Sequence, residues 1–154
     1  MTSTILSVIL AINSFVVQFT QQKQSLLFDS IQKSSGKLTF LQPDYIKWEY
    51  FSPDSLVWEL DSNKGNMPRQ IKDMLMLIRE GINGDFEQAK VLFELSIDGN
   101  SITLVPKKRE LKNIFNNIRI SLNPMTQIAD YVEMTEANGD KTIIYFTDVQ
   151  FLER

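Results

Sequence analysis

The chain has 154 residues, of which 43% are hydrophobic and 23% charged, and its formal net charge is −3. This length and composition are typical of one globular domain, which we place at residues 1–154, and the small negative charge gives no reason to expect nucleic acid as a partner. The sequence contains no cysteine and no histidine. Disulfides, thiolate chemistry, Ser-His-Asp hydrolysis and histidine-based metal sites are therefore excluded.

The N-terminal segment is uncharged, as a membrane span or a signal-peptide core would be, but it contains only a short apolar run. Residues 1–22 carry no charged side chain, but their longest apolar run covers only the five residues from Val8 to Ile12, with no basic residue before it. This run is too short for a membrane span and lacks the flank of a signal peptide. We expect a chain that does not span a membrane, and a secreted protein whose leader peptide is not present in the chain would look the same.

The first predicted elements are a helix and a strand. Apolar residues recur at helical spacing between residues 4 and 14, which predicts an amphipathic helix carrying Ile5, Val8, Ile9 and Ile12. From Ser14 the period changes to two, because Phe15, Val17 and Phe19 alternate with smaller or polar residues. Residues 21–35 are polar apart from Leu26, Leu27, Phe28 and Ile31, and could hold the end of this strand, a loop and a short strand.

The stretch from Gly36 to Leu60 predicts three short antiparallel strands. Gln42-Pro43-Asp44 and Ser52-Pro53-Asp54 separate them, since proline removes a ladder donor. Between these breaks large apolar residues alternate with polar ones, so one face carries Leu38, Phe40, Ile46, Trp48, Tyr50, Leu56, Trp58 and Leu60. The other face carries Lys37, Thr39, Lys47, Glu49 and Glu59. The apolar face needs a cover, which could be a sheet, a helix or a ligand.

A second helix is predicted from about Pro68 to Glu80, after a turn or loop at residues 61–65. Its apolar stripe of Ile71, Met74, Leu75 and Ile78 is widened by Met76 and Leu77.

The rest of the chain predicts a meander of strands at residues 91–97, 101–105, 114–122, 128–135 and 141–151. Asp98-Gly99-Asn100 and Asn138-Gly139 are hairpin turn signals, and residues 106–110 form a basic tip. The predicted fold is therefore mainly β, with one antiparallel sheet and two helices. The acidic residues have no spacing typical of a glycosidase or metal site, and no phosphate-binding glycine loop occurs.

Several short motifs resemble one family when they are taken in order. They cover nearly the whole chain and are Ser14-Phe15, Gln18-Phe19-Thr20-Gln21, Gly36-Lys37-Leu38, Pro43, Lys47-Trp48-Glu49-Tyr50, Pro53, Gly84-Asp85-Phe86, Ile102-Thr103-Leu104-Val105-Pro106-Lys107 and Asn138-Gly139-Asp140-Lys141-Thr142 before Phe146. The set is similar to that of the LolA-like periplasmic outer-membrane lipoprotein carriers.

This resemblance implies an unclosed β-barrel, which is a strongly curved antiparallel sheet capped by two or so helices. It also implies a periplasmic carrier that shields the acyl chains of a lipoprotein, receives them from an inner-membrane ABC-type release complex and passes them to an outer-membrane acceptor. No cofactor, metal or catalytic residue is implied. Gln42 stands where many members have an arginine latch, residues 61–68 form a shorter segment than expected, and the chain stops at Arg154 without a further strand.

A curved sheet that does not close leaves apolar surface to be covered, and flexible methionines suit a changing partner. We therefore expect an acyl-chain cavity and lid formed by Leu38, Phe40, Trp48, Tyr50, Leu56, Trp58, Met74, Leu75, Ile78, Phe93, Leu95, Leu104, Ile118, Ile120, Val132 and Met134. For any single residue, ordinary core packing is the alternative.

Three functions are open at this point: a carrier, a lipid- or lipoprotein-sensing regulatory module on the same scaffold, and an enzyme with a buried carboxylate. Fold relatives include anti-sigma-factor regulators and one enzyme, so the fold alone does not decide between them. Lys107, Lys108 and Arg109 could dock an acidic partner or form a solvated tip. We expect a carrier without enzymatic activity.

Overall fold

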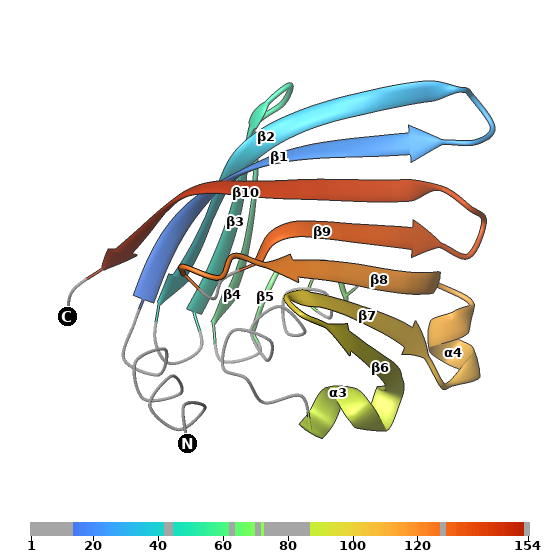
Figure 1. Cartoon of the computed structure of the whole chain (residues 1–154). Coiled ribbons are helices and arrows are strands. Elements are labelled where there is room, and N and C mark those ends of the chain that lie inside the picture. Colours follow the sequence, from blue (N-terminus) through green and yellow to red (C-terminus); the bar gives the residue numbers. More distant parts are fainter. Residues whose placement is uncertain are drawn as a thin grey trace, which may run out of the picture. The chain divides into compact units, whose positions relative to one another are not determined.

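The computed structural model describes residues 14–41, 45–61, 64–69, 72, 87–126 and 129–152. In these ranges ten strands form one antiparallel sheet in the order β5-β4-β3-β2-β1-β10-β9-β8-β7-β6 (Figure 1). β5 and β6 stand at opposite ends of this order and do not pair with each other, so the sheet of the described strands is not closed. The predicted mainly β fold with an unclosed sheet is confirmed.

The strands are β1 (Ser14–Ser25), β2 (Ser30–Leu41), β3 (Tyr45–Ser52), β4 (Leu56–Asp61), β5 (Lys64–Gly65), β6 (Phe93–Asp98), β7 (Ser101–Pro106), β8 (Phe115–Leu122), β9 (Ala129–Glu136) and β10 (Lys141–Leu152). The helices in the described part of the chain include α3 (Glu87–Leu92) and α4 (Arg109–Lys112). The chain divides into two compact units. Residues 1–20, 34–84 and 146–154 form the first unit, and residues 21–33 and 85–145 form the second. The assignment of one domain to residues 1–154 stays a prediction.

In the first unit, cross-strand pairing places the predicted apolar residues on one face. Trp48 pairs with Leu38 on β2 and with Trp58 on β4. Residues directly opposite each other in antiparallel strands point to the same side of the sheet, so these three side chains share a face. Phe40, Ile46 and Leu60 form the neighbouring row. The period-two assignment of residues 36–60 is therefore confirmed.

Gly36 occupies a position in β2 that no other residue fits. The ladder between β2 and β3 shifts register between Ser35 and Gly36. A Cβ atom on Gly36 would collide with the carbonyl oxygen of Glu49 and would lie 2.8 Å from Cζ of Phe19. The close approach of β2 to β3 therefore requires glycine at this point.

The second unit contains a meander in which β6 to β10 follow one another in chain order and lie side by side (Figure 1). Both predicted turn glycines have left-handed backbones, with φ of +61° at Gly99 and +93° at Gly139. Its buried apolar residues alternate along the strands, and they are Phe93, Ile102, Leu104, Phe115, Ile118, Ile120, Ala129, Val132 and Ile144.

One sequence assignment in the second unit was wrong, and one helical turn was not predicted. Val91 was predicted to begin a strand, but α3 continues to Leu92 and β6 begins at Phe93. Most residues of α3 favour a helix, namely its glutamate, glutamine, alanine, lysine and leucine. At the end of α3 the carbonyl of Leu92 accepts the N–H of Lys107 at 2.8 Å, where the chain enters the sheet. The basic tip contains a helical turn, α4, in which the amide of Lys112 donates to the carbonyl of Lys108 at 3.0 Å.

The region around residues 61–72 is partly described. Residues 64–65, predicted as turn or loop, form the short strand β5, in which Gly65 pairs with Leu60. The amide of Lys72 donates to the carbonyl of Pro68 at 2.9 Å, which is the hydrogen bond of a helical turn starting at the predicted position. The predicted helix at 4–14, Gln42, the lid residues Met74, Leu75 and Ile78, and the motif at 84–86 lie outside the described residues. Each helix in the part of the chain that the structure describes is too short or too polar to span a bilayer.

Candidate functional site

The expected binding residues that the structure describes fall into two sets, one in each unit. The first-unit apolar face consists of Leu38, Phe40, Trp48, Tyr50, Leu56 and Trp58, on β2 to β4. The second-unit apolar face consists of Phe93, Leu95, Leu104, Ile118, Ile120, Val132 and Met134, on β6 to β9. Their role in binding stays a prediction.

Burial decreases along the first-unit apolar face. Trp48 is completely buried and Leu38 is 4% exposed, whereas Tyr50 and Trp58 are half-buried and Leu56 is 45% exposed. Tyr50 and Leu56 are directly paired near the turn that joins β3 to β4. The face therefore runs from a closed core at its centre to accessible apolar surface at this end.

A series of ring contacts connects the buried part of this face with the accessible part. Trp48 stacks on Phe19 with centroids 4.2 Å apart and meets Tyr50 edge-on at 6.1 Å. Tyr50 in turn meets Trp58 at 5.4 Å, with the ring planes at 90°. Edge-to-face and offset arrangements are the favourable ones for aromatic pairs.

The expected set omitted two aromatic residues of this cluster. Phe19 stacks on Trp48, and Phe146 of β10 contacts Trp48 edge-on at 6.3 Å. The alternation of Phe15, Val17 and Phe19 could have placed Phe19 on the apolar face, because it has the same period as the strands that follow. Phe146 gave no such signal, since nothing local pairs β10 with β1.

The indole N–H of Trp48 is exceptional among the described polar groups. Its Nε1 atom is buried and has no hydrogen-bond partner among the described residues. Buried tryptophan N–H groups usually find an acceptor, because an unpaired donor loses its hydration without compensation. The apolar surroundings therefore contain one donor that a carbonyl oxygen could satisfy.

The second-unit apolar face is more completely buried. Leu95, Leu104, Ile118 and Met134 form one row across β6 to β9, and Ile120 pairs with Val132 in the next row. Leu104, Ile118 and Val132 are at most 1% exposed, while Leu95 and Met134 are half-buried. Phe93 stacks on Phe115 with centroids 5.8 Å apart. Most of this set is packed core, and its accessible part is limited to Leu95 and Met134.

The opposite face of the first unit is polar and internally paired. Lys47 lies 3.7 Å and Lys37 3.9 Å from the carboxylate of Glu49. The hydroxyl of Tyr45 donates to Glu59 at 2.9 Å. Burial, followed by this hydrogen bond and the charge of Glu59, raises the pKa of Tyr45 to about 12.

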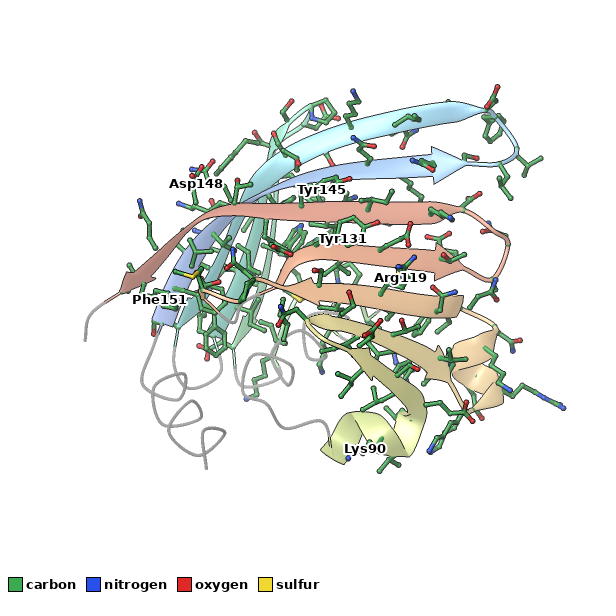
Figure 2. All side chains as sticks on the ribbon, viewed as in Figure 1. Lys90, Arg119, Tyr131, Tyr145, Asp148 and Phe151 are labelled. Atoms are coloured by element: carbon green, nitrogen blue, oxygen red, sulfur yellow. The ribbon has the colours of Figure 1, made fainter. Side chains whose placement is uncertain are left out.

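The corresponding face of the second unit carries Arg119, Tyr131 and Tyr145 (Figure 2). The two tyrosine rings lie 5.3 Å apart, and Arg119 lies 3.6 Å from Glu133. Burial and the charge of Glu133 raise the pKa of Tyr131. The described residues contain no cluster of three or more acidic side chains that could hold a metal ion. These contacts connect the polar side chains of neighbouring strands on this face.

The basic segment that begins at Lys107 is partly structural. The ammonium group of Lys107 donates to the carbonyl of Lys90 at 2.8 Å, near the C-terminal end of α3, where a positive charge is favourable. Lys107 thus links α3 to the end of β7. Docking of an acidic partner to this segment stays a prediction.

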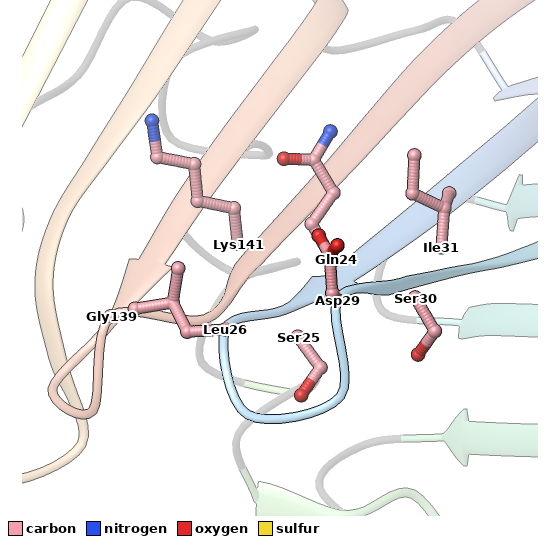
Figure 3. A pocket seen from close by; sticks show the side chains of 8 residues that line it. All are labelled: Gln24, Ser25, Leu26, Asp29, Ser30, Ile31, Gly139 and Lys141. Atoms are coloured by element: carbon pink, nitrogen blue, oxygen red, sulfur yellow. The ribbon is translucent and has the colours of Figure 1, made fainter.

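A cleft in the second unit lies where two hairpins end (Figure 3). It has a volume of about 420 Å³ and is lined by Gln24, Ser25, Leu26, Asp29, Ser30, Ile31, Gly139 and Lys141. No expected binding residue contributes to it. The sequence contained only a weak signal for it, namely the apolar run at residues 26–28 inside an otherwise polar stretch.

The sequence matches the family described as outer membrane lipoprotein carrier protein LolA over residues 11–153. Among solved structures, the complex of MucA and MucB from Pseudomonas aeruginosa gives a TM-score of 0.58 at 10% identity, covering 97% of this chain and 56% of that chain. A structure of MucB alone gives 0.57 at 11% identity, covering 97% and 58%. The chain thus spans little more than half the length of these neighbours, and the likeness concerns the fold. Curated proteins include no significant match.

Proposed function

Since the chain belongs to the LolA outer membrane lipoprotein carrier family, we propose that it binds the acyl chains of lipoproteins and carries them between membranes. In this proposal the protein works in the periplasm. It receives cargo from an inner-membrane ABC-type release complex and delivers it to an outer-membrane acceptor. The work consists of binding and release, with no chemical step.

The accessible end of the first-unit apolar face is the observation that carries this proposal. Leu56 is 45% exposed next to the half-buried Tyr50 and Trp58, and these rings continue to the buried Trp48. Covering apolar surface is favourable by roughly 25 cal/mol per Å². An acyl chain laid along these side chains would cover them and would itself leave water.

Leu56 and Val57 provide a matched pair for a test. They are adjacent and similarly exposed, at 45% and 38%. Leu56 pairs with Tyr50 on the apolar face, whereas Val57 pairs with Glu49 on the polar face. The binding of a triacylated peptide should be measured for the unchanged chain, Leu56→Gln and Val57→Gln, with the same peptide lacking acyl chains as the reference.

We expect the acylated peptide to bind, the peptide without acyl chains not to bind, and Leu56→Gln to weaken binding by about tenfold, which is the effect of losing one apolar contact. Val57→Gln should bind like the unchanged chain. Equal binding of the two peptides, or equal effects of the two substitutions, would contradict a carrier that uses this face.

A second candidate is a module that binds a protein, on the same scaffold. One solved neighbour with a TM-score above 0.5 is titled as MucB in complex with MucA. Such a function predicts a stable equimolar complex that persists during size-exclusion chromatography without any lipid. If Leu56→Gln and Val57→Gln both leave that complex intact while no acylated peptide binds, the module is favoured over the carrier.

A further inference from the structure

The turn between β1 and β2 begins with three consecutive apolar residues that face solvent. Leu26 is 72% exposed, Leu27 86% and Phe28 77%, and Ile31 just after them is 57% exposed. Residues 26–28 form the hairpin tip. Scattered single apolar residues are ordinary on protein surfaces, but a continuous exposed group usually marks an interaction site.

The form of the hairpin tip indicates what could cover it. Its three residues lie inside a turn between two strands, so consecutive side chains leave the backbone in different directions. A protein partner could cover such a convex tip only with a groove of matching shape. The acyl region of a bilayer, in contrast, surrounds any small apolar projection that enters it. Exposed apolar side chains at an end of a hairpin therefore suit a lipid layer.

Behind the tip, the two strands carry long polar side chains. β1 contributes Gln22, Lys23 and Gln24, and β2 contributes Gln32 and Lys33. Lysine can extend its charged end towards water while its methylene groups lie along apolar surface. These residues would lie at the level of the lipid headgroups if the tip entered the acyl region.

The tip is braced by the turn between β9 and β10. The amide of Leu26 donates to Oδ1 of Asp140 at 3.1 Å, and Asn138 donates to the other oxygen of that carboxylate at 3.2 Å. Asp29 has a left-handed backbone, with φ of 46°, and lines the cleft together with Gln24 and Lys141 (Figure 3). Asp29, the charged residue of this turn, thus lies at the cleft, and residues 26–28 are the uncharged part of the turn.

We propose that the hairpin tip inserts Leu27 and Phe28 into the surface of a phospholipid bilayer, with the glutamines and lysines behind it at the headgroups. This site brings the protein to a membrane reversibly and shares no residue with the apolar faces, so its test is independent of acyl-chain binding. Leu26 has a mainly structural part, because it is fastened to Asp140.

The first test is the flotation of the full chain with vesicles of phosphatidylethanolamine and phosphatidylglycerol. Replacing Leu27 and Phe28 together by serine should lower the partition coefficient by about tenfold or more, because two apolar side chains are lost from the lipid contact. Met125→Ser is the control, since Met125 is an 89% exposed apolar residue in another turn. It should leave partition unchanged. Equal partition of the double variant and the unchanged chain would overturn the proposal.

The second test measures insertion directly. Phe28→Trp and Met125→Trp each add one indole to the same background of Trp48 and Trp58, and vesicles with brominated acyl chains quench an indole that enters them. Extra quenching is expected for Phe28→Trp and not for Met125→Trp.

If the double serine variant instead abolishes self-association measured by sedimentation, with no change on vesicles, the tip binds a second copy and the proposal is wrong. Acylated-peptide binding that survives in the double variant separates this site from the first-unit apolar face.

Discussion

The side chain of Leu26 lies directly over Gly139. Its Cδ1 atom is 2.5 Å from the position that a Cβ on Gly139 would take, and the backbone of Gly139 has φ of +93°. Together with the hydrogen bond from Leu26 to Asp140, this contact joins two turns that are far apart in the sequence. Position 139 favours glycine through its left-handed backbone, and an added Cβ would also push aside the exposed end of the Leu26 side chain.

Gly139→Ala should therefore destabilise the protein by about 1 to 2 kcal/mol, mainly through backbone strain, with a small addition from displacing the exposed end of Leu26. Gly99→Ala is the matched control, because Gly99 also has a left-handed backbone but nothing lies within 4 Å of its missing Cβ. It should cost about 1 kcal/mol. Urea denaturation measures both, and Leu26→Ala should abolish most of the difference. Equal losses of unfolding free energy in the two glycine variants would show that the contact between Leu26 and position 139 does not affect stability.

Gly36→Ala should be more damaging than either turn variant. The obstacle there is the backbone carbonyl of Glu49, which cannot move without breaking the ladder between β2 and β3. We expect a loss of about 3 kcal/mol or more in the free energy of unfolding. Thermal and urea unfolding followed by circular dichroism provide the measurement. A loss similar to that of Gly99→Ala would mean that the bulge at Gly36 relaxes easily.

Sequence reasoning succeeded where the information was local. Leu38, Trp48 and Trp58 could be placed on one face because alternation fixes side-chain direction within a strand and the proline breaks fix where strands end. Gly99 and Gly139 were recognised because left-handed turns between strands favour glycine.

Sequence reasoning failed where tertiary contacts decide. Val91 and Leu92 could belong to a strand or a helix, and the hydrogen bond from Lys107 to Leu92, which depends on a distant residue, marks the end of α3. Phe146 contacts Trp48 only because β10 lies beside β1 in the sheet order. The hairpin tip was described only as part of a polar stretch, since periodicity contains no information about exposure in a turn.

The high pKa of Tyr45 predicts a change of stability with pH. A folded-state pKa of about 12, against the ordinary value of 10.0, means that the folded protein keeps a proton that the unfolded chain loses. This contribution to stability is complete below pH 10 and is lost as the pH rises towards 12. Between pH 10 and 12 the free energy of unfolding should decrease less for Tyr45→Phe than for the unchanged chain. Urea denaturation at a series of pH values measures this difference. Parallel curves for the two proteins would contradict the assignment.

The two tryptophans should differ in accessibility. The chain has only Trp48, which is completely buried, and Trp58, which is half-buried. In Trp58→Phe the remaining indole should emit at shorter wavelength and be quenched weakly by acrylamide. In Trp48→Phe the quenching constant should be several-fold larger, by about three to five times, because the remaining indole is reached by solvent. Similar quenching in both variants would show that the buried centre of the face opens readily in solution.

The most direct measurement of acyl-chain binding uses Trp48→Phe, in which Trp58 on the first-unit apolar face is the only indole. This variant should be titrated with a triacylated peptide whose acyl chains carry bromine, and with the same peptide without acyl chains. A carrier that binds cargo on this face predicts saturable quenching of Trp58 by the brominated peptide and no effect of the other. Unchanged Trp58 emission at peptide concentrations that saturate binding to the protein would contradict it.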